Sequence, residues 1–183
     1  TLMNIIGFLD QTSDGSYTFD EQDVSTLTEN QKSKLRNQYI GFIFQQFFLI
    51  QSLNVSQNVE LPMVYEGKKN ENKRKKIAKH YLNLVGLSGK ENSKTTELSG
   101  CQQQRVAIAR ALVNEPLVIM ADEPTGALDS ETSADIMAIL SDLNKQGKTI
   151  VMVTHDNDMK KYASRVVYMK DGLFLDEEEY LNA

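Results

Sequence analysis

The sequence has almost none of the features that mark secreted, fibrous or membrane-spanning proteins. It contains one cysteine and therefore no intrachain disulfide, which fits a reducing compartment. No apolar run approaches the roughly 18 residues that a membrane-spanning helix needs, and the first residues lack the pattern of a secretory signal. The net charge of -5 argues against nucleic acid as a partner, because surfaces that bind nucleic acid are usually basic overall.

What remains is the composition of an ordinary globular protein. Of the 183 residues, 40% are hydrophobic and 25% are charged, which is enough apolar material for one sizeable core. From Val118 onward, the apolar runs LVIMA and TIVMVT are separated by a helical pattern at residues 130–147. Apolar strands without polar alternation, separated by helices, predict a parallel sheet with both faces covered, and hence an α/β fold.

The pattern at residues 130–147 predicts a helix with Ser130 as its N-cap and Gly147 as its C-terminal stop. The residues predicted to face inward from this helix are Ile136, Ile139, Leu140 and Leu143. After the second strand, RVVYMKDGLFL predicts a hairpin around Asp171 and Gly172.

The first part of the chain predicts four elements. The sequence TLMNIIGFLD has the stripe of a helix with one buried face, SYTF is typical of a short strand, TENQKSKLRNQY indicates a polar helix, and IGFIF indicates a buried strand. The residues of the predicted buried stripe in the opening helix are Leu2, Ile5, Ile6 and Leu9.

The middle of the chain, residues 52–115, has a different character and predicts a helical lobe inserted into the α/β core. The core itself would be formed by residues 1–51 and 116–183. Within the lobe, NENKRKKIAKHYLNLVGL predicts a helix with lysines on its outer face. The residues predicted on its inner face are Ile77, Tyr81, Leu84 and Val85.

Two adjacent carboxylates, Asp122 and Glu123, follow the LVIMA strand. They lie at the carboxyl edge of the predicted sheet, where open α/β sheets bind ligands. Two acids at this position repel each other unless a cation or another positive group is present. On one interpretation, Asp122 holds Mg²⁺ and Glu123 orients a water that attacks a phosphate; on the other, the strand simply ends with its acids in solvent.

The sequence LSGCQQQRVAIARAL contains a second candidate site. Ser99 and Gln102 have the spacing of a capping box before an apolar helix, and a well-capped helix is one complete interpretation. The other interpretation is an anion site, because the free N–H groups, the positive dipole end and the serine hydroxyl all lie at this helix start.

Taken in order, these motifs resemble those of the ATP-binding-cassette (ABC) ATPases. LSGCQ resembles the signature motif, VIMADE the Walker B strand, ALD at 127–129 the D-loop, VTHD the switch histidine, and FIFQQFFLI the Q-loop. The resemblance implies a P-loop NTPase (RecA-like) core with an inserted helical subdomain. The wording of NVELPMVY and DEPTGALDSETSADIM is similar to the branch that serves macrolide export, lipoprotein release and antimicrobial-peptide export.

The resemblance implies a function and a role for each matching residue. The cofactors would be ATP and Mg²⁺, with Gln45 touching Mg²⁺ or the attacking water and Asp122 holding the metal. Glu123 would be the general base, and His155 would bind the γ-phosphate. The Q-loop region would meet a transmembrane permease, and the protein would lie in the cytoplasm on the inner face of the membrane.

The family sandwiches ATP between two subunits, so the resemblance also implies a homodimer. Ser99, Gly100 and Gln102 of one subunit would face the nucleotide of the other, and Asp129 would reach across the interface. Two other interpretations remain open: a non-transport ABC ATPase that acts on ribosomes or DNA, or a chain that does not hydrolyse ATP. Neither a second cassette nor a long coiled-coil insertion is visible.

The start of the chain and the signature motif each depart from the family pattern. In the family, LMNIIG follows the Gly-Lys-Ser-Thr of a glycine-rich phosphate loop, so Thr1 is expected to border the nucleotide site and the chain to be a fragment without that loop. Cys101 stands where the family has its second signature glycine. Its side chain either hinders close approach to the phosphate or is tolerated without consequence.

Overall fold

The computed structural model describes residues 1–182, and residues 1–153 form one compact unit while the chain from Thr154 forms a second. The helices and strands of the first unit are α1 (Leu2–Ile6), β1 (Thr18–Phe19), β2 (Gln22–Asp23), η1 (Val24–Thr26), α2 (Glu29–Tyr39), β3 (Ile40–Phe44), α3 (Val55–Tyr65), α4 (Glu71–Leu84), η2 (Thr95–Glu97), α5 (Gly100–Leu112), β4 (Val118–Asp122), α6 (Ser130–Lys145) and β5 (Thr149–Val153).

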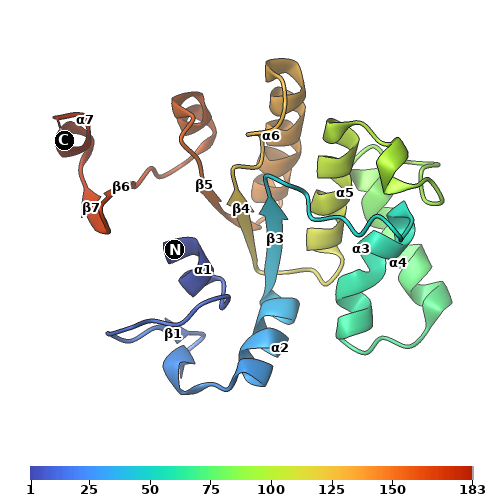
Figure 1. Cartoon of the computed structure of the whole chain (residues 1–183), viewed down its shortest axis with the longest axis horizontal. Helices are drawn as coiled ribbons and strands as arrows, with labels where there is room; N and C mark the ends of the chain where they lie inside the picture. The colour runs from blue at the N-terminus through green and yellow to red at the C-terminus, as the bar shows by residue number, and fades with distance from the viewer. Residues whose placement is uncertain (183) are drawn as a thin grey trace. The chain divides into compact units, whose positions relative to one another are not determined.

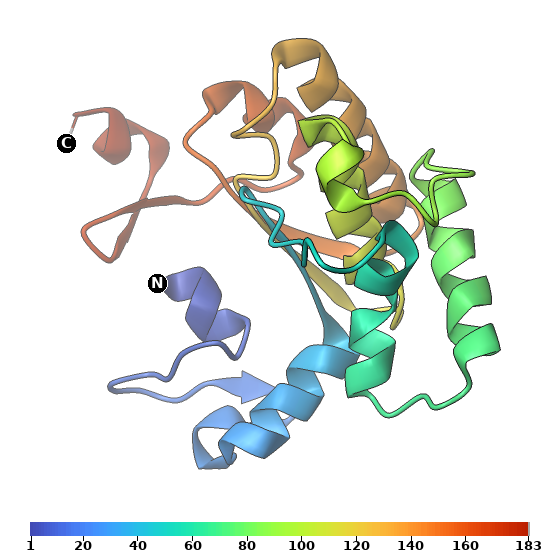
Figure 2. The same ribbon diagram turned by 45° about the vertical axis from the view of Figure 1, so that its right-hand side comes forward.

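The first unit is built around a parallel sheet, as predicted, and its strands follow the order β3-β4-β5 (Figure 1). All three strands are apolar runs, and the central strand β4 has Ile119, Met120 and Ala121 fully buried. A strand that is buried on both faces needs cover on both faces. Figure 2 shows α1 on one side of the sheet and α5 and α6 on the other.

Strand alternation assigns the side chains of the sheet to these two layers. Ile40 and Met120 join Met3 and Phe8 in the core on the α1 side. Gly41 points to the opposite side, where a Cβ at its position would overlap the carbonyl oxygen of Ala111 in α5. Glycine therefore lets the backbone of α5 approach β3 closely, and α5 is held directly against the strand that precedes Gln45.

The helices α3, α4 and α5 follow β3 and precede β4 in the sequence, and they pack against one another. Val59 and Met63 of α3 and Ala78 and Leu82 of α4 are fully buried among them. The predicted inner face of α4 was wrong at Leu84, which is 41% exposed. The buried row of α4 follows the i, i+4 spacing from Ala78 to Leu82, and Leu84 lies two residues further around the helix.

The predicted buried stripe of the opening helix was wrong at Leu9, whereas Ile6 packs against the core. Helix α1 ends at Ile6, and the buried side chains are those of Met3 and Phe8, while Leu9 is 45% exposed. Phe8 has a φ of 59°, so the chain leaves the helical path before Leu9 completes the stripe. A second correction concerns α6, which is capped by Asp129 and not by Ser130.

The second unit contains η3 (Asn157–Tyr162), the antiparallel pair β6 (Tyr168–Lys170) and β7 (Leu173–Leu175), and α7 (Glu177–Asn182). The hairpin turns at Asp171 and Gly172, as predicted, and both residues have positive φ. This backbone conformation matches the twist of the flanking strands and favours an Asp-Gly pair. Helix α7 begins beside Asp176, whose carboxylate accepts the backbone N–H of Glu179 at 2.8 Å.

Candidate functional site

The carboxyl ends of the three parallel strands lie in register. Phe44 pairs with Asp122, and Asp122 pairs with Val153, so the chain leaves all three strands at one edge of the sheet. Gln45 is the first residue after β3, and Glu123 is the first residue after β4. Strand alternation places Asp122 on the same face as Met120, which is the face that α1 covers. The register thus sets Gln45, Asp122 and Glu123 along one edge.

Glu123 is held at this edge by a tight turn. Its backbone N–H donates to the carbonyl oxygen of Val153 at 2.9 Å, and its own carbonyl accepts the N–H of Gly126 at 3.0 Å. Its φ of 45° is uncommon for a residue with a side chain. Backbone conformations of this kind persist only when the surrounding structure enforces them, and here two backbone hydrogen bonds do so.

Gln45 and Glu123 meet around Gly126. A Cβ at Gly126 would lie 2.8 Å from Nε2 of Gln45 and 3.3 Å from Cβ of Glu123. The absence of a side chain at Gly126 therefore lets the Gln45 amide lie against the turn that carries Glu123. The structure brings together Gln45 and Glu123, which the resemblance assigns to the Q-loop and to the Walker B motif and which are 78 positions apart (123 minus 45) in the sequence.

The loop after Gln45 is fixed by Arg110 of α5. Its guanidinium donates from Nη1 to the carbonyl of Phe48 at 2.6 Å and from Nη2 to the carbonyl of Phe47 at 2.7 Å. Phe47 and Phe48 both have positive φ, 56° and 46°. Burial lowers the pKa of Arg110 from its usual high range. A planar fork that donates to two successive carbonyls can hold such a loop, whereas a lysine at this position can offer only a point charge.

The signature residues lie at the start of α5. The Ser99 hydroxyl accepts the N–H of Gln102 at 3.3 Å, and the Gln102 side chain accepts the N–H of Ser99 at 3.1 Å, which is the predicted capping box. Ser99 and Gly100 are exposed. A Cβ at Gly100 would lie 3.7 Å from Leu128 and 3.9 Å from Phe47, so the signature motif adjoins both the D-loop and the Q-loop of its own chain.

Cys101, the departure from the family pattern, is half-buried in the first turn of α5. Its sulfur accepts a hydrogen bond from Nε of Arg105 at 3.5 Å. Arg105 also donates to the carbonyl of Val85 at 3.0 Å and to Asp135 of α6 at 2.8 Å. The thiol is therefore held by a side chain that also ties α5 to the end of α4 and to α6.

Asp129 of the D-loop caps helix α6. Its two carboxylate oxygens accept the backbone N–H of Thr132 at 2.9 Å and the Thr132 hydroxyl at 2.8 Å. Both hydrogen bonds lower the pKa of Asp129, and the one from the backbone N–H of Thr132 has the larger effect. The residue expected to reach across a dimer thus also fixes the start of its own helix.

Two predicted site residues remain, Thr1 and His155. Thr1 is the N-cap residue of α1, on the Asp122 side of the sheet, and its carbonyl accepts the N–H groups of Asn4 and Ile5. His155 lies at the beginning of the second unit. The roles of Thr1 and His155 stay predictions.

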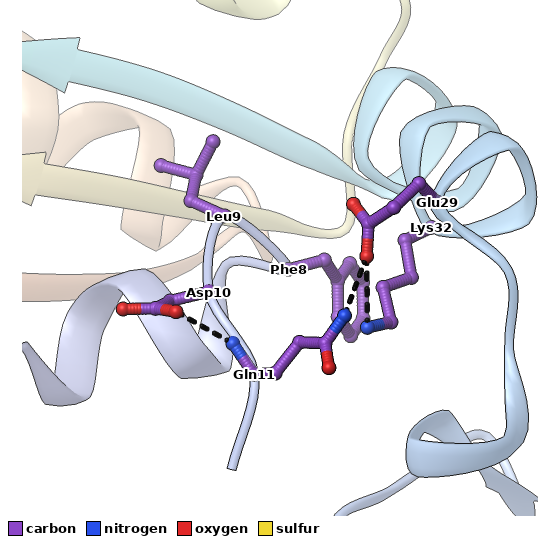
Figure 3. Close-up of a pocket in the computed structure, with 6 residues that line it drawn as sticks. All are labelled: Phe8, Leu9, Asp10, Gln11, Glu29 and Lys32. Carbon is purple, nitrogen blue, oxygen red and sulfur yellow. Dashed lines mark hydrogen bonds and ion pairs between the residues drawn. The ribbon is translucent and has the colours of Figure 1, made fainter. Parts of the chain in front are cut away.

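A pocket near the N-terminus contains none of the predicted site residues (Figure 3). In it, Lys32 is only 3% exposed and pairs with Glu29 at 3.2 Å, while Gln11 donates to the same carboxylate at 2.9 Å. Both interactions lower the pKa of Glu29. The hydrogen bond from Gln11 has the largest single effect, and the hydrogen bond from Lys32 follows. Lys32 and Glu29 are paired with each other, and Asp10 accepts the backbone N–H of Gln11. Because the pocket contains none of the motif residues, it is not the candidate site.

The candidate site fits Mg²⁺ through its kind of donor atoms. Asp122 and Gln45 offer carboxylate and amide oxygens, the hard ligands that Mg²⁺ prefers, and Mg²⁺ commonly uses one or two protein ligands and takes the rest from water and phosphates. Within residues 1–182 there is no cluster of three or more His, Cys, Asp or Glu side chains able to hold a metal. In the same residues, no helix is long and apolar enough to cross a membrane.

Sequence reasoning missed Arg110 and Gln104, two α5 residues that contact the loops of the site. Gln104 is fully buried and donates from Nε2 to the carbonyl of Pro124, next to Glu123. A weak signal for both was available, because Gln104 and Arg110 interrupt the apolar residues of the segment QRVAIARAL, as Arg105 also does. Their partners lie 20 and about 60 positions away, which helical periodicity does not reveal.

Known proteins are similar to this chain in sequence and in fold. The ABC transporter family pattern matches residues 1–126. Over 178 residues the chain is 51% identical to the ABC transporter ATP-binding protein YvrO of Bacillus subtilis, which covers 97% of this chain and 77% of YvrO. It is also 51% identical over 177 residues to the macrolide export ATP-binding/permease protein MacB of Campylobacter jejuni, which covers 97% of this chain but 28% of MacB.

The structure is similar to a dimeric structure of the bacterial ABC transporter cassette MJ0796, with a TM-score of 0.84 and 45% identity over 93% of this chain and 75% of that one. A second dimeric structure of MJ0796, a post-hydrolysis state bound to ADP and Pi, matches with the same TM-score and 44% identity. Fold and sheet edge together define an α/β, P-loop NTPase-like cassette. The chain belongs to the ABC transporter family.

Proposed function

We propose that this chain is the ATP-hydrolysing subunit of a bacterial ABC transporter of the exporter type. The observation that carries the proposal is the meeting of Gln45 and Glu123 around Gly126, at the sheet edge where Asp122 ends β4. A carboxylate metal ligand, an amide and a second carboxylate on one edge are the groups that phosphoryl transfer by positioning and electrostatics requires.

These residues would have different roles, and Gln45 would have two. Asp122, with Gln45, would hold Mg²⁺, which when bound neutralises charge on the phosphates. Glu123 would orient the attacking water and accept its proton, and Gln45 would contact the same water. His155 would bind the γ-phosphate, and Thr1 would border the nucleotide. The turn that fixes the backbone of Glu123 supports its role, because a general base has to be held in place.

We also propose that two copies form the active sites together. The signature residues Ser99 and Gly100 are exposed, and the Gln102 side chain stabilises the helix start that presents them. Free N–H groups and the positive end of the α5 dipole at this place would attract the γ-phosphate bound to the other copy. Asp129 would approach the same interface. The dimeric structures of MJ0796 support this arrangement.

A permease partner is proposed on the Q-loop side of the chain. Phe48 and Ile50 are 58% and 41% exposed, and Arg110 fixes the backbone at Phe48. Val64 and Tyr65, at the end of α3, are 49% and 75% exposed. Exposed apolar side chains on a held loop and a helix end favour a protein contact. The similarity to MacB supports an export system, with this chain on the cytoplasmic face of the membrane.

The experiment that tests this function supplies the phosphate-binding loop that the 183 residues do not contain. A Walker A segment of the form G-x-x-x-x-G-K-S, with the strand before it, is fused ahead of Thr1; this protein is called the loop-supplemented chain. We expect it to release phosphate from ATP in the presence of Mg²⁺ and to stop when the metal is chelated. Absence of hydrolysis with intact folding and ATP binding would contradict the proposal.

Gly126→Ala in the loop-supplemented chain is expected to lower ATP turnover by about tenfold to a hundredfold. A methyl group at this position overlaps the Gln45 amide, which then has to move, and a misplacement of about 1 Å can cost on the order of a hundredfold. Because the closest overlap is with the end of a flexible side chain, and Cβ of Glu123 at 3.3 Å needs to give only slightly, the urea midpoint should change little. Wild-type turnover in the variant would show that the position of Gln45 does not matter.

A further inference from the structure

The side chain of Gln104 is a direct link between α5 and the turn that carries Glu123. Gln104 is fully buried, and its Nε2 donates to the carbonyl oxygen of Pro124. A proline carbonyl can only accept, so the side-chain amide has to present its nitrogen to it. The signature helix is therefore bonded to the residue that immediately follows Glu123.

The other end of the same amide has no partner. Within the described residues, Oε1 of Gln104 is buried and accepts no hydrogen bond. A buried acceptor without a donor costs free energy, and an apolar side chain of similar size would avoid that cost. Packing alone therefore does not account for glutamine at this position, whereas the hydrogen bond to Pro124 does.

The linked turn is held by backbone hydrogen bonds at Glu123 and Gly126. The backbone N–H of Glu123 donates to Val153, and the N–H of Gly126 donates back to Glu123. Pro124 has no N–H to contribute, so its carbonyl, which belongs to the peptide that joins Pro124 to Thr125, is the backbone group of Pro124 to which a neighbour can donate a hydrogen bond. Gln104 supplies that neighbour from α5.

We propose that Gln104 is a positioning residue for Glu123: through Pro124 it couples the orientation of the signature helix to the turn that holds the general base. The proposal rests on the function proposed above for Glu123. It predicts that the hydrogen bond contributes to the order of the turn and to turnover more than to the stability of the whole unit.

The first test uses the 183-residue chain and measures hydrogen exchange at the amides of Glu123 and Gly126 by NMR. In Gln104→Met, a side chain of similar size without a donor, we expect about tenfold faster exchange at these amides, which is the loss of one net hydrogen bond. The urea midpoint should change little, because the orphaned acceptor disappears together with the bond. Gln103→Met is the matched control, since Gln103 donates to Leu98 and not to the turn.

Gln104→Glu provides a conditional rescue. Burial raises the pKa of a carboxyl group, and a protonated carboxyl can donate to the Pro124 carbonyl whereas a carboxylate cannot. Relative to wild type at the same pH, exchange protection of Glu123 and Gly126 should be normal below the raised pKa of the new side chain and lost above it. If both Gln104 variants protected the amides of Glu123 and Gly126 as well as wild type does at every pH, the proposal would be overturned.

The second test measures turnover in the loop-supplemented chain. Gln104→Met should lower kcat by about tenfold with unchanged ATP affinity, because the turn holds a group that acts on water and not one that binds nucleotide. If the wild-type loop-supplemented chain hydrolyses ATP and Gln104→Met does so equally fast, the role of Gln104 is wrong. If wild type does not hydrolyse ATP, the proposed function fails, and the exchange data still decide whether Gln104 orders the turn.

Discussion

Glu123→Gln in the loop-supplemented chain is expected to lower ATP turnover by roughly a hundredfold or more, because general-base catalysis contributes on the order of 10² to 10⁴. Glutamine keeps the shape of the side chain and the turn at Gly126, but it removes the charge that orients water and accepts a proton. ATP should therefore still bind, and the unhydrolysed nucleotide should hold two copies together. Phosphate release and the molecular mass in solution with ATP measure both effects.

The matched control is Glu131→Gln, which removes an exposed carboxylate from the first turn of α6, eight positions along the chain (131 minus 123). It should hydrolyse ATP at the wild-type rate. A Glu123→Gln variant that turns over at a similar rate would remove Glu123 from its role. A variant that stays monomeric with bound ATP would separate catalysis from the proposed dimer.

The phosphate loop should have the largest effect on binding. The 183 residues contain no glycine-rich loop with a lysine for the β- and γ-phosphates. We expect the loop-supplemented chain to bind ATP on the order of a thousandfold more tightly than the 183-residue chain, since three factors of ten correspond to about 4 kcal/mol. Calorimetry with ATP and Mg²⁺ measures the two affinities directly.

A fusion that carries alanine in place of the loop lysine serves as the control, because it adds the same length of chain without the positive charge. Its affinity should lie close to that of the 183-residue chain. Micromolar ATP affinity of the 183-residue chain itself would show that its own residues bind the nucleotide without a phosphate loop.

The parallel sheet and the order of the site motifs could be predicted from the sequence. The runs IGFIF, LVIMA and TIVMVT are apolar throughout, and such runs form strands buried on both faces. The capping box at Ser99 could also be predicted, because Ser99 and Gln102 are three positions apart and the motif depends on the local backbone alone. Features that depend on residues close together in the sequence were predicted well.

Helix ends and helix phases were predicted less well, for physical reasons. The stripe of the opening helix failed because a positive φ at Phe8 redirects the chain before Leu9. The cap of α6 was placed one residue late, because Asp129 and Ser130 are both good N-cap residues and local propensity does not distinguish them. Boundaries of this kind depend on the tertiary path of the chain.

Long-range polar contacts could not be predicted from the sequence at all. Gln104 donates to Pro124, and Arg110 donates to Phe47 and Phe48, across the packing of α5 on the sheet, where Gly41 allows a close approach of α5 to β3. No local pattern links these residues. The candidate site therefore consists of acids and a glutamine that motifs reveal, held in place by α5 residues that only the fold reveals.

We propose that each active site is shared between two copies of this chain. Mixing two inactive variants of the loop-supplemented chain tests this directly. Glu123→Gln lacks the general base, and Ser99→Arg blocks the signature motif. In a mixed dimer, one site combines the intact Glu123 of one copy with the intact Ser99 of the other. We predict that the mixture recovers up to about a quarter of wild-type turnover, since half of randomly formed dimers are mixed and each has one intact site. Turnover that stays at the level of the separate variants, in a mixture shown to contain mixed dimers, would contradict the account.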